Sequence, residues 1–199
     1  MTPHPVLADH RFAAVSVHTS GQRPPEIVEL SVVTIDRGAV SSAPLTWVAG
    51  PTRPVTGHAI RGYGIRVGEL SGRAPFAAVA GEVAAVLDTR RLVAHGARVV
   101  ADALDAELPD LRPPAVLDTL PLVRRVWPYA APGSLPELAV RARLRLPDAA
   151  AGTAWRAQAT ARLFLYLTDR LAGTLPDLTA ERLCRIAARY RHRAGRDAR

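Results

Sequence analysis

Ser16 and His18 are the first residues in the chain whose side chains could do chemistry together. They lie at the end of the apolar run that begins at Phe12, which reads as a buried strand, and residues two apart on a strand share a face. A serine nucleophile also needs an acid that orients the histidine, and no acid stands close by in the sequence. A zinc site would need a partner carboxylate or a second close histidine. The spacing therefore supports neither kind of site.

The elements that position these residues follow from hydrophobic period and from Pro-rich breaks. We expect strands near 12–18, 26–36, 43–49, 91–95 and 115–119. We expect helices near 75–88, 98–108, 119–127, 134–143, 153–172 and 179–192. The pattern divides the chain into a flexible N-terminus at 1–10, a main domain at 11–172 and a basic C-terminal helix and tail at 173–199.

Seven segments, in this order and spacing, resemble the DnaQ-like 3′–5′ exonucleases, the DEDDh branch of the ribonuclease H-like fold. They are Phe12–Gly21, Ile27–Leu30, His58–Ile65, Leu92–Ala97, Val116–Leu120, Ser134–Ala139 and Ala157–Phe164. The resemblance implies an α/β fold with a central five-stranded mixed sheet flanked by helices. The first three strands would be antiparallel and the last two would add in parallel.

The positions that carry catalysis in that family have other residues here. The two acids of the first strand correspond to Ser16 and His18, and the third acid corresponds to Val100. The fourth acid corresponds to Arg156 and the general-base histidine to Ala151. Two divalent metal ions need clustered anionic oxygen ligands, which these residues do not supply. We therefore expect a pseudo-exonuclease that binds no metal or other cofactor, and we do not expect an enzyme.

A shifted alignment is the alternative that would restore activity. Asp102 lies two residues beyond Val100, about 200° around a helix, and should point elsewhere. Asp148 precedes Ala151 by three residues, in a loop. Glu29 and Asp118 are also present, but the family uses neither position for metal. A residual exonuclease with displaced ligands remains a second alternative.

The cleft that holds the metal ions in the family has two interpretations in this chain. In the first, Arg156 receives a phosphate bidentately, and the ligand site comprises His18, Thr19, Arg61, His95, Arg98 and Arg156. The ligand would be nucleic acid or a nucleotide phosphate. In the second, Arg156 turns to solvent or pairs with Glu29, and the fold serves as a protein-interaction scaffold.

Composition limits the class of protein. The chain has 199 residues, enough for one domain with a sizeable core, and its one cysteine excludes an internal disulfide framework. No apolar stretch is long enough to span a membrane and no signal pattern opens the chain, so we expect a cytoplasmic protein. All 26 basic residues are arginine, a bias that indicates a GC-rich bacterial genome.

The net charge of +8 favours a polyanionic partner. More than half of it lies at the C-terminus, where seven arginines face only Glu181 and Asp197. Leu183, Ile186, Ala187 and Tyr190 form an apolar stripe on the expected helix, either against the body or against a protein partner. The opposite face would contact phosphates or only solvent. It includes Arg182, Arg185, Arg189 and Arg193.

Overall fold

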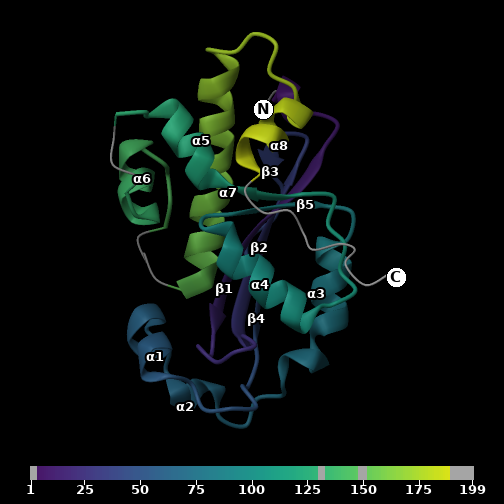
Figure 1. Cartoon of the computed structure of the whole chain (residues 1–199), viewed down its shortest axis with the longest axis vertical. Helices are drawn as coiled ribbons and strands as arrows, with labels where there is room; N and C mark the ends of the chain where they lie inside the picture. Colours follow the sequence, from purple (N-terminus) through teal and green to yellow (C-terminus); the bar gives the residue numbers. More distant parts are fainter. Residues whose placement is uncertain (1–3, 130–132, 148–151, 189–199) are drawn as a thin grey trace, which may run out of the picture.

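The computed structural model describes residues 4–129, 133–147 and 152–188, and within them a mixed six-stranded sheet is flanked by helices (Figure 1). The strands are β1 (Arg11–Thr19), β2 (Ile27–Asp36), β3 (Ala39–Val40), β4 (Leu45–Val48), β5 (Arg91–Ala94) and β6 (Val116–Asp118). Their order is β3-β2-β1-β5-β6, and β4 also pairs with β2. β2 is antiparallel to β1, β3 and β4, whereas β5 runs parallel to β1 and β6 parallel to β5. The expected α/β fold is confirmed, with one strand more than predicted because the two-residue β3 is too short to carry a pattern.

The helices cover both faces of this sheet (Figure 1). The α-helices are α1 (Gly57–Tyr63), α2 (Val67–Leu70), α3 (Ala80–Leu87), α4 (Ala97–Glu107), α5 (Thr119–Val126), α6 (Leu135–Arg141), α7 (Gly152–Ala172) and α8 (Ala180–Ala187). Two 3₁₀ helices, η1 (Pro5–Leu7) and η2 (Phe76–Ala78), complete the set found in the described residues. The helix predicted at 75–88 is divided into η2 and α3, and α1 and α2 were not predicted as helices.

Alternation along β1 sorts its side chains into two cores, because successive strand residues point to opposite faces. Phe12 and Ala14 pack in one core with α5, α6, α7 and α8. Ala13, Val15 and Val17 pack in the other with α3 and α4. By the same alternation Ser16 and His18 lie on the α7 face.

The C-terminal helix α8 belongs to the first core. Leu183 and Ala187 are fully buried, and Ile186 packs against the same cluster. The suggestion that this stripe is a free docking surface is therefore wrong for these three residues, because the body already covers them. Tyr190, Arg189 and Arg193 lie outside the described residues.

The N-terminal segment also differs from the expectation. Residues 1–10 were predicted to be flexible, yet Leu7 in η1 is fully buried in the α7-side core. The backbone N–H of Leu7 donates to the carbonyl of His4 at 2.9 Å. Residues 4–10 are thus part of the fold, since burying a leucine side chain stabilises it by roughly 1.5–3 kcal/mol.

The turn after β1 fixes the position of α1. Gly21 has φ +78°, and a Cβ there would collide with the Thr56 hydroxyl. The backbone N–H of Thr56 donates to the carbonyl of Ser20 at 2.9 Å, and its hydroxyl caps α1 by accepting from the N–H of Ala59 at 3.2 Å. A glycine is required at this close approach. The turn therefore holds α1 beside the end of β1.

Candidate functional site

The end of β1 brings His18 opposite an acid that the sequence analysis did not assign to it. The antiparallel register pairs His18 with Glu29 of β2, and both lie on the α7 face. The Nδ1 atom of His18 is 3.5 Å from Oε2 of Glu29. No acid stands near His18 in the local sequence, and the acid that faces this imidazole comes from the neighbouring strand.

Glu29 also connects β2 to the start of α7. Its carboxylate accepts hydrogen bonds from the backbone N–H and the hydroxyl of Thr153, and Thr153 shares a 2.7 Å hydrogen bond with Ser31. The hydrogen bond from His18 holds the pKa of Glu29 at about 2, and the bonds from Thr153 act in the same direction against the effect of burial. Glu29 is therefore ionised at neutral pH, and its carboxylate is occupied by protein donors.

A pocket of about 150 Å³ lies beside this network, at the carboxyl ends of the parallel strands β1 and β5. Ligands of open α/β sheets bind outside this end of the strands. The polar side chains that line the pocket are Ser16, Tyr63, His95, Arg156 and Thr160, and the remainder of the wall is Val15, Val17, Gly96, Val99, Val100 and Leu135. The structure thus brings together Ser16, Val100, His95 and Arg156, four of the positions that the sequence singled out.

His18 lies behind the pocket wall and not among the lining residues. It is almost fully buried, and its ring stacks on that of Tyr63 with centroids 4.6 Å apart. Tyr63 itself lines the pocket from the end of α1. His18 therefore supports the site through Tyr63 and Glu29.

Asp118 organises the turn that carries His95. Its buried carboxylate accepts from the backbone N–H groups of Gly96 and Ala97, each at 3.1 Å, and of Leu120 at 2.9 Å. It thereby caps the N-termini of α4 and α5. The hydroxyl of Thr119 lies 2.8 Å from Nδ1 of His95 and holds this histidine by a side-chain hydrogen bond.

The surroundings of His95 favour its neutral form. Burial lowers its pKa, the positive charge of Arg156 lowers it further, and the negative charge of Asp118 partly offsets both. A neutral imidazole can donate one hydrogen bond and accept another. The formal positive charge among the lining residues therefore comes from Arg156.

Arg156 does not pair with Glu29, although this pairing was one of the two arrangements expected for a cleft that binds no ligand. Glu29 instead binds His18 and Thr153. Within the described part of the chain, no ion pair or hydrogen bond reaches the Arg156 guanidinium, and its side chain lines the pocket. The structure therefore leaves this guanidinium facing the space that a ligand would occupy.

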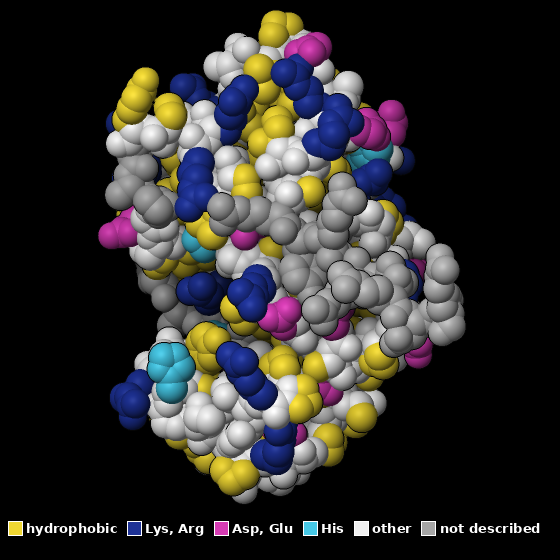
Figure 2. Space-filling view, viewed as in Figure 1, with side chains coloured by type: hydrophobic (Ala, Val, Ile, Leu, Met, Phe, Trp, Pro, Cys, Tyr) yellow, Lys and Arg dark blue, Asp and Glu magenta, His cyan; other side chains and the backbone are white. Residues whose placement is uncertain are grey.

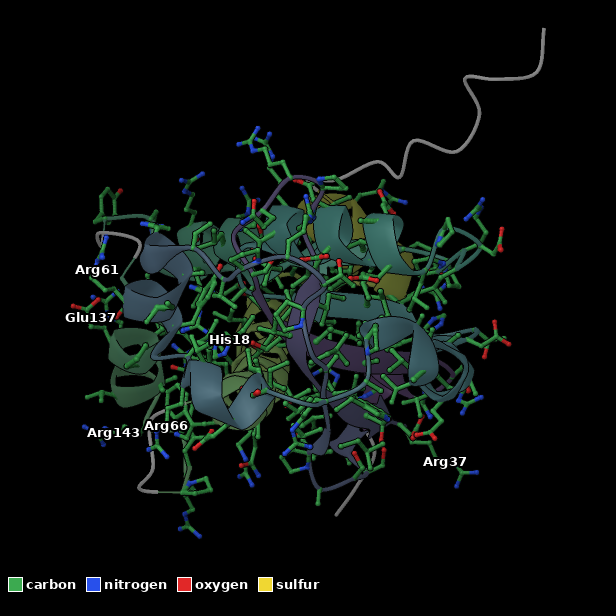
Figure 3. The ribbon with its side chains drawn as sticks, turned by 90° about the horizontal axis from the view of Figure 1, so that it is seen from below. His18, Arg37, Arg61, Arg66, Glu137 and Arg143 are labelled. Carbon is green, nitrogen blue, oxygen red and sulfur yellow. The ribbon has the colours of Figure 1, made fainter. Side chains whose placement is uncertain are left out.

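The other predicted ligand residues do not line this pocket. Thr19 and Arg98 line a second pocket of about 340 Å³, together with Gln22, Arg23, Pro24, Pro25, Val99 and Asp102. Arg61 lines neither pocket: it is exposed on α1, and Figure 3 shows it at the periphery, away from His18. On α8, Arg182 pairs with Asp177, and Arg185 is exposed.

The donor groups do not fit a pair of divalent metal ions. No three His, Cys, Asp or Glu side chains gather at metal-binding distance within the residues that the structure describes. Ser16, Val100 and Arg156 supply no anionic oxygen, and Mg²⁺ and Mn²⁺ prefer carboxylates. Glu29 and Asp118 use their oxygens on protein donors. Ala151 and Asp148 lie outside the described residues.

The fold is shared with solved exonuclease structures. Exonuclease X in complex with 5′ overhanging duplex DNA has a TM-score of 0.68 and 21% identity, covering 88% of this chain and 98% of its own. E. coli exonuclease I in complex with a dT13 oligonucleotide has a TM-score of 0.70 and 14% identity, covering 85% and 43%.

At the sequence level, the chain is similar to the 3′–5′ exonuclease DinG of Bacillus subtilis (strain 168). The two are 28% identical over 190 residues, which make up 90% of this chain and 20% of the relative. The chain thus spans about a fifth of the length of that relative. No protein-family model matches the chain.

Three residues of the site were missed by the sequence analysis. Tyr63 was seen only as part of a motif, because α1 was not predicted as a helix. Thr153 and Thr160 lie seven residues apart on α7, close to two helical turns, and therefore share the face that meets β1 and β2. This helical spacing could have identified the two threonines, because it places them on one face of the helix, and the site was already expected on the strand face that carries Ser16.

Proposed function

We propose that this chain is a DnaQ-like exonuclease-type domain that binds nucleic acid or a nucleotide phosphate without metal-dependent cleavage. The observation that carries the proposal is the Arg156 guanidinium, which lines a pocket at the carboxyl ends of β1 and β5 whose lining residues include no carboxylate. An arginine there supplies the positive charge that metal ions supply in a two-metal hydrolase.

Similarity to DNA-bound structures supports a nucleic-acid ligand. Exonuclease X and exonuclease I were both solved with DNA bound, and this chain shares their fold. The surface charge agrees with this assignment: Figure 2 shows arginine side chains spread over the viewed face of the molecule, with fewer acidic ones among them. Positive charge attracts the phosphate backbone without regard to sequence.

The loss of cleavage follows from the donor chemistry. The described residues offer no cluster of carboxylates that would hold two divalent ions about 4 Å apart and activate the attacking water. Arg156 would also repel a cation at this position. The pocket is therefore suited to holding a phosphate and not to hydrolysing its ester.

The test is to incubate labelled single-stranded DNA and RNA with the protein, with and without Mn²⁺, and to record gel retention and product length together. We expect retention that weakens steeply as salt rises, with no shortening of the strand. Arg156→Gln should reduce retention. The matched control is Arg170→Gln, which changes an exposed arginine about 21 Å further along the same helix.

Metal-dependent shortening that disappears in Asp102→Asn would contradict the loss of cleavage. It would favour the residual exonuclease instead, since Asp102 lines the second pocket. Absence of both binding and cleavage would favour a protein-interaction scaffold, for which α8 offers no uncovered apolar stripe in its described residues.

The described helices include none that is both long enough and apolar enough to cross a membrane. The cytoplasmic location stays a prediction.

A further inference from the structure

The two pockets at the end of β1 are neighbours that share one residue. Val99 of α4 lines both the 150 Å³ pocket, which contains Arg156, and the 340 Å³ pocket, which contains Arg98 and Thr19. The side chain of Val99 is half exposed. We call the first the inner pocket and the second the outer pocket. Val99 therefore places the two pockets side by side, and a ligand that extends past this side chain would reach from one pocket into the other.

The inner pocket suits a small anionic group with several acceptor oxygens. Its volume of about 150 Å³ is below the roughly 300 Å³ at which pockets begin to hold whole small molecules. Its polar lining consists of the Arg156 guanidinium, the hydroxyls of Ser16, Tyr63 and Thr160, and His95. Within the described residues, the hydroxyls of Ser16 and Thr160 have no hydrogen-bond partner. These groups can all donate to an oxyanion.

The negative charge nearest the inner pocket is already compensated. Asp118 acts on His95 through space, but its two oxygens accept from three backbone N–H groups. Glu29 is held by His18 and Thr153. Among the described residues, these two carboxylates near Arg156 are therefore already bound by protein donors.

The outer pocket is large enough for the remainder of a nucleotide. Its volume of about 340 Å³ falls in the usual range for small-molecule sites. Arg23, Arg98 and Gln22 line it with donors, and Val99 offers an apolar surface to a sugar or base. Asp102 also lines it, 3.7 Å from Nε of Arg98. The combination of one small anionic subsite and one larger mixed subsite matches a phosphate joined to a nucleoside.

We propose that the paired pockets bind a terminal nucleotide through its phosphomonoester, with the phosphate in the inner pocket and the nucleoside in the outer pocket. The inference rests on the proposed function and specifies the ligand. A terminal phosphomonoester carries about −1.5 to −2 charge at pH 7, whereas an internal phosphodiester carries a single charge. The inner pocket, at about 150 Å³, has room for a phosphate group and not for a further nucleotide. The protein should therefore prefer phosphorylated ends to hydroxyl ends.

The experiment measures fluorescence anisotropy with one single-stranded DNA sequence in four forms: 3′-phosphate, 3′-hydroxyl, 5′-phosphate and 5′-hydroxyl, each labelled at the other end. A nucleoside monophosphate and a circular single strand, which has no ends, serve as competitors. We expect about tenfold tighter binding of one phosphorylated end, because a charge-assisted arginine contact is worth roughly one factor of ten or more. The nucleoside monophosphate should compete, and the 3′ and 5′ forms identify which end is bound.

Variants separate the two pockets. Arg156→Gln should remove the preference for the phosphorylated end, whereas Arg170→Gln should retain it. Val99→Glu, which places a negative charge on the shared wall, should weaken binding of the phosphorylated end while leaving the far-ultraviolet circular dichroism unchanged.

The outcomes distinguish this inference from the function on which it rests. Salt-sensitive binding with equal affinity for all four ends and for the circular competitor would overturn the inference and leave the proposed function standing. A preference that survives Arg156→Gln would also overturn it. No binding of any strand, and none of the nucleoside monophosphate in a direct titration, at low salt would overturn the proposed function, and the inference with it.

Discussion

Replacing Glu29 by glutamine tests whether the carboxylate, and not only the shape of the side chain, joins β1, β2 and α7. The substitution keeps the size of the side chain but removes the charge that accepts hydrogen bonds from His18 and Thr153. A hydrogen bond to a charged group contributes roughly 1.5–3 kcal/mol. The Glu29 side chain is 28% exposed, so solvent screens part of this effect. We expect a loss of about 2 kcal/mol in the free energy of unfolding at pH 7.

The effect should depend on pH in a defined direction. The folded-state pKa of Glu29 is lowered from 4.5 to about 2, chiefly by the hydrogen bond from His18. A group with a depressed folded pKa stabilises the protein above its unfolded pKa, and this stabilisation is lost as pH falls through the folded value. The wild type should therefore exceed Glu29→Gln in stability by the full amount above about pH 5. The difference should shrink from there toward pH 2.

Urea unfolding at pH 7, 4 and 3, followed by circular dichroism, measures both predictions. A loss of about 2 kcal/mol corresponds to a melting temperature lower by about 4–8 °C for a chain of this size. The matched control is Glu69→Gln, because Glu69 is well exposed and its ion pair with Arg66 lies at the surface, where such pairs contribute about 0–1 kcal/mol. Equal midpoints for wild type and Glu29→Gln at pH 7, or a difference that is just as large at pH 3, would refute the reasoning.

Three further substitutions or reactions test other parts of the fold. Asp118→Ala should lower the free energy of unfolding by about 3 kcal/mol in urea, since it leaves three N–H groups without their acceptor; a loss below about 1 kcal/mol would contradict the capping role. Leu183→Ala should cost about 3 kcal/mol because this side chain is fully buried, whereas Arg185→Ala on the exposed face of α8 should cost little. Burial raises the pKa of the Cys184 thiol, so Ellman's reagent should react slowly with the native protein and rapidly in urea; equal rates would mean that α8 is not packed as described.

Most of the fold was predictable because its long elements carry periodic patterns. β1, β2 and α7 each extend over nine or more residues, and their apolar period identifies both their type and the face they bury. The short elements carry no such pattern. β3 has two residues and α2 has four, so neither contains a full period. α1 is defined instead by Thr56 as its cap and Gly64 at φ +68°, which are local signals that only the structure confirms.

The candidate site was predictable where a strand or helix position fixed it, and not where it depended on contact between strands. Arg156 and His95 followed from their spacing within recognised segments. The partner of His18 did not, because Glu29 reaches it only through the β1–β2 register. A shift by one residue would place Glu29 on the opposite face. Tyr63 was missed for a related reason, since its stacking on His18 depends on how the turn at Gly21 holds α1.

The hydrogen bonds that Asp118 accepts determine how α4 and α5 can move. One carboxylate on β6 is the common acceptor for the first amides of two helices, so neither N-terminus can fray alone without leaving a buried charge short of donors. α4 and α5 should therefore open together, as one cooperative unit, and only at a free-energy cost close to that of unfolding the surrounding sheet. Gly96, Val99 and Val100 of the inner pocket lie on the segment anchored in this way. That wall is thus pre-organised before any ligand arrives, and binding requires little of the ordering entropy that a mobile loop would lose.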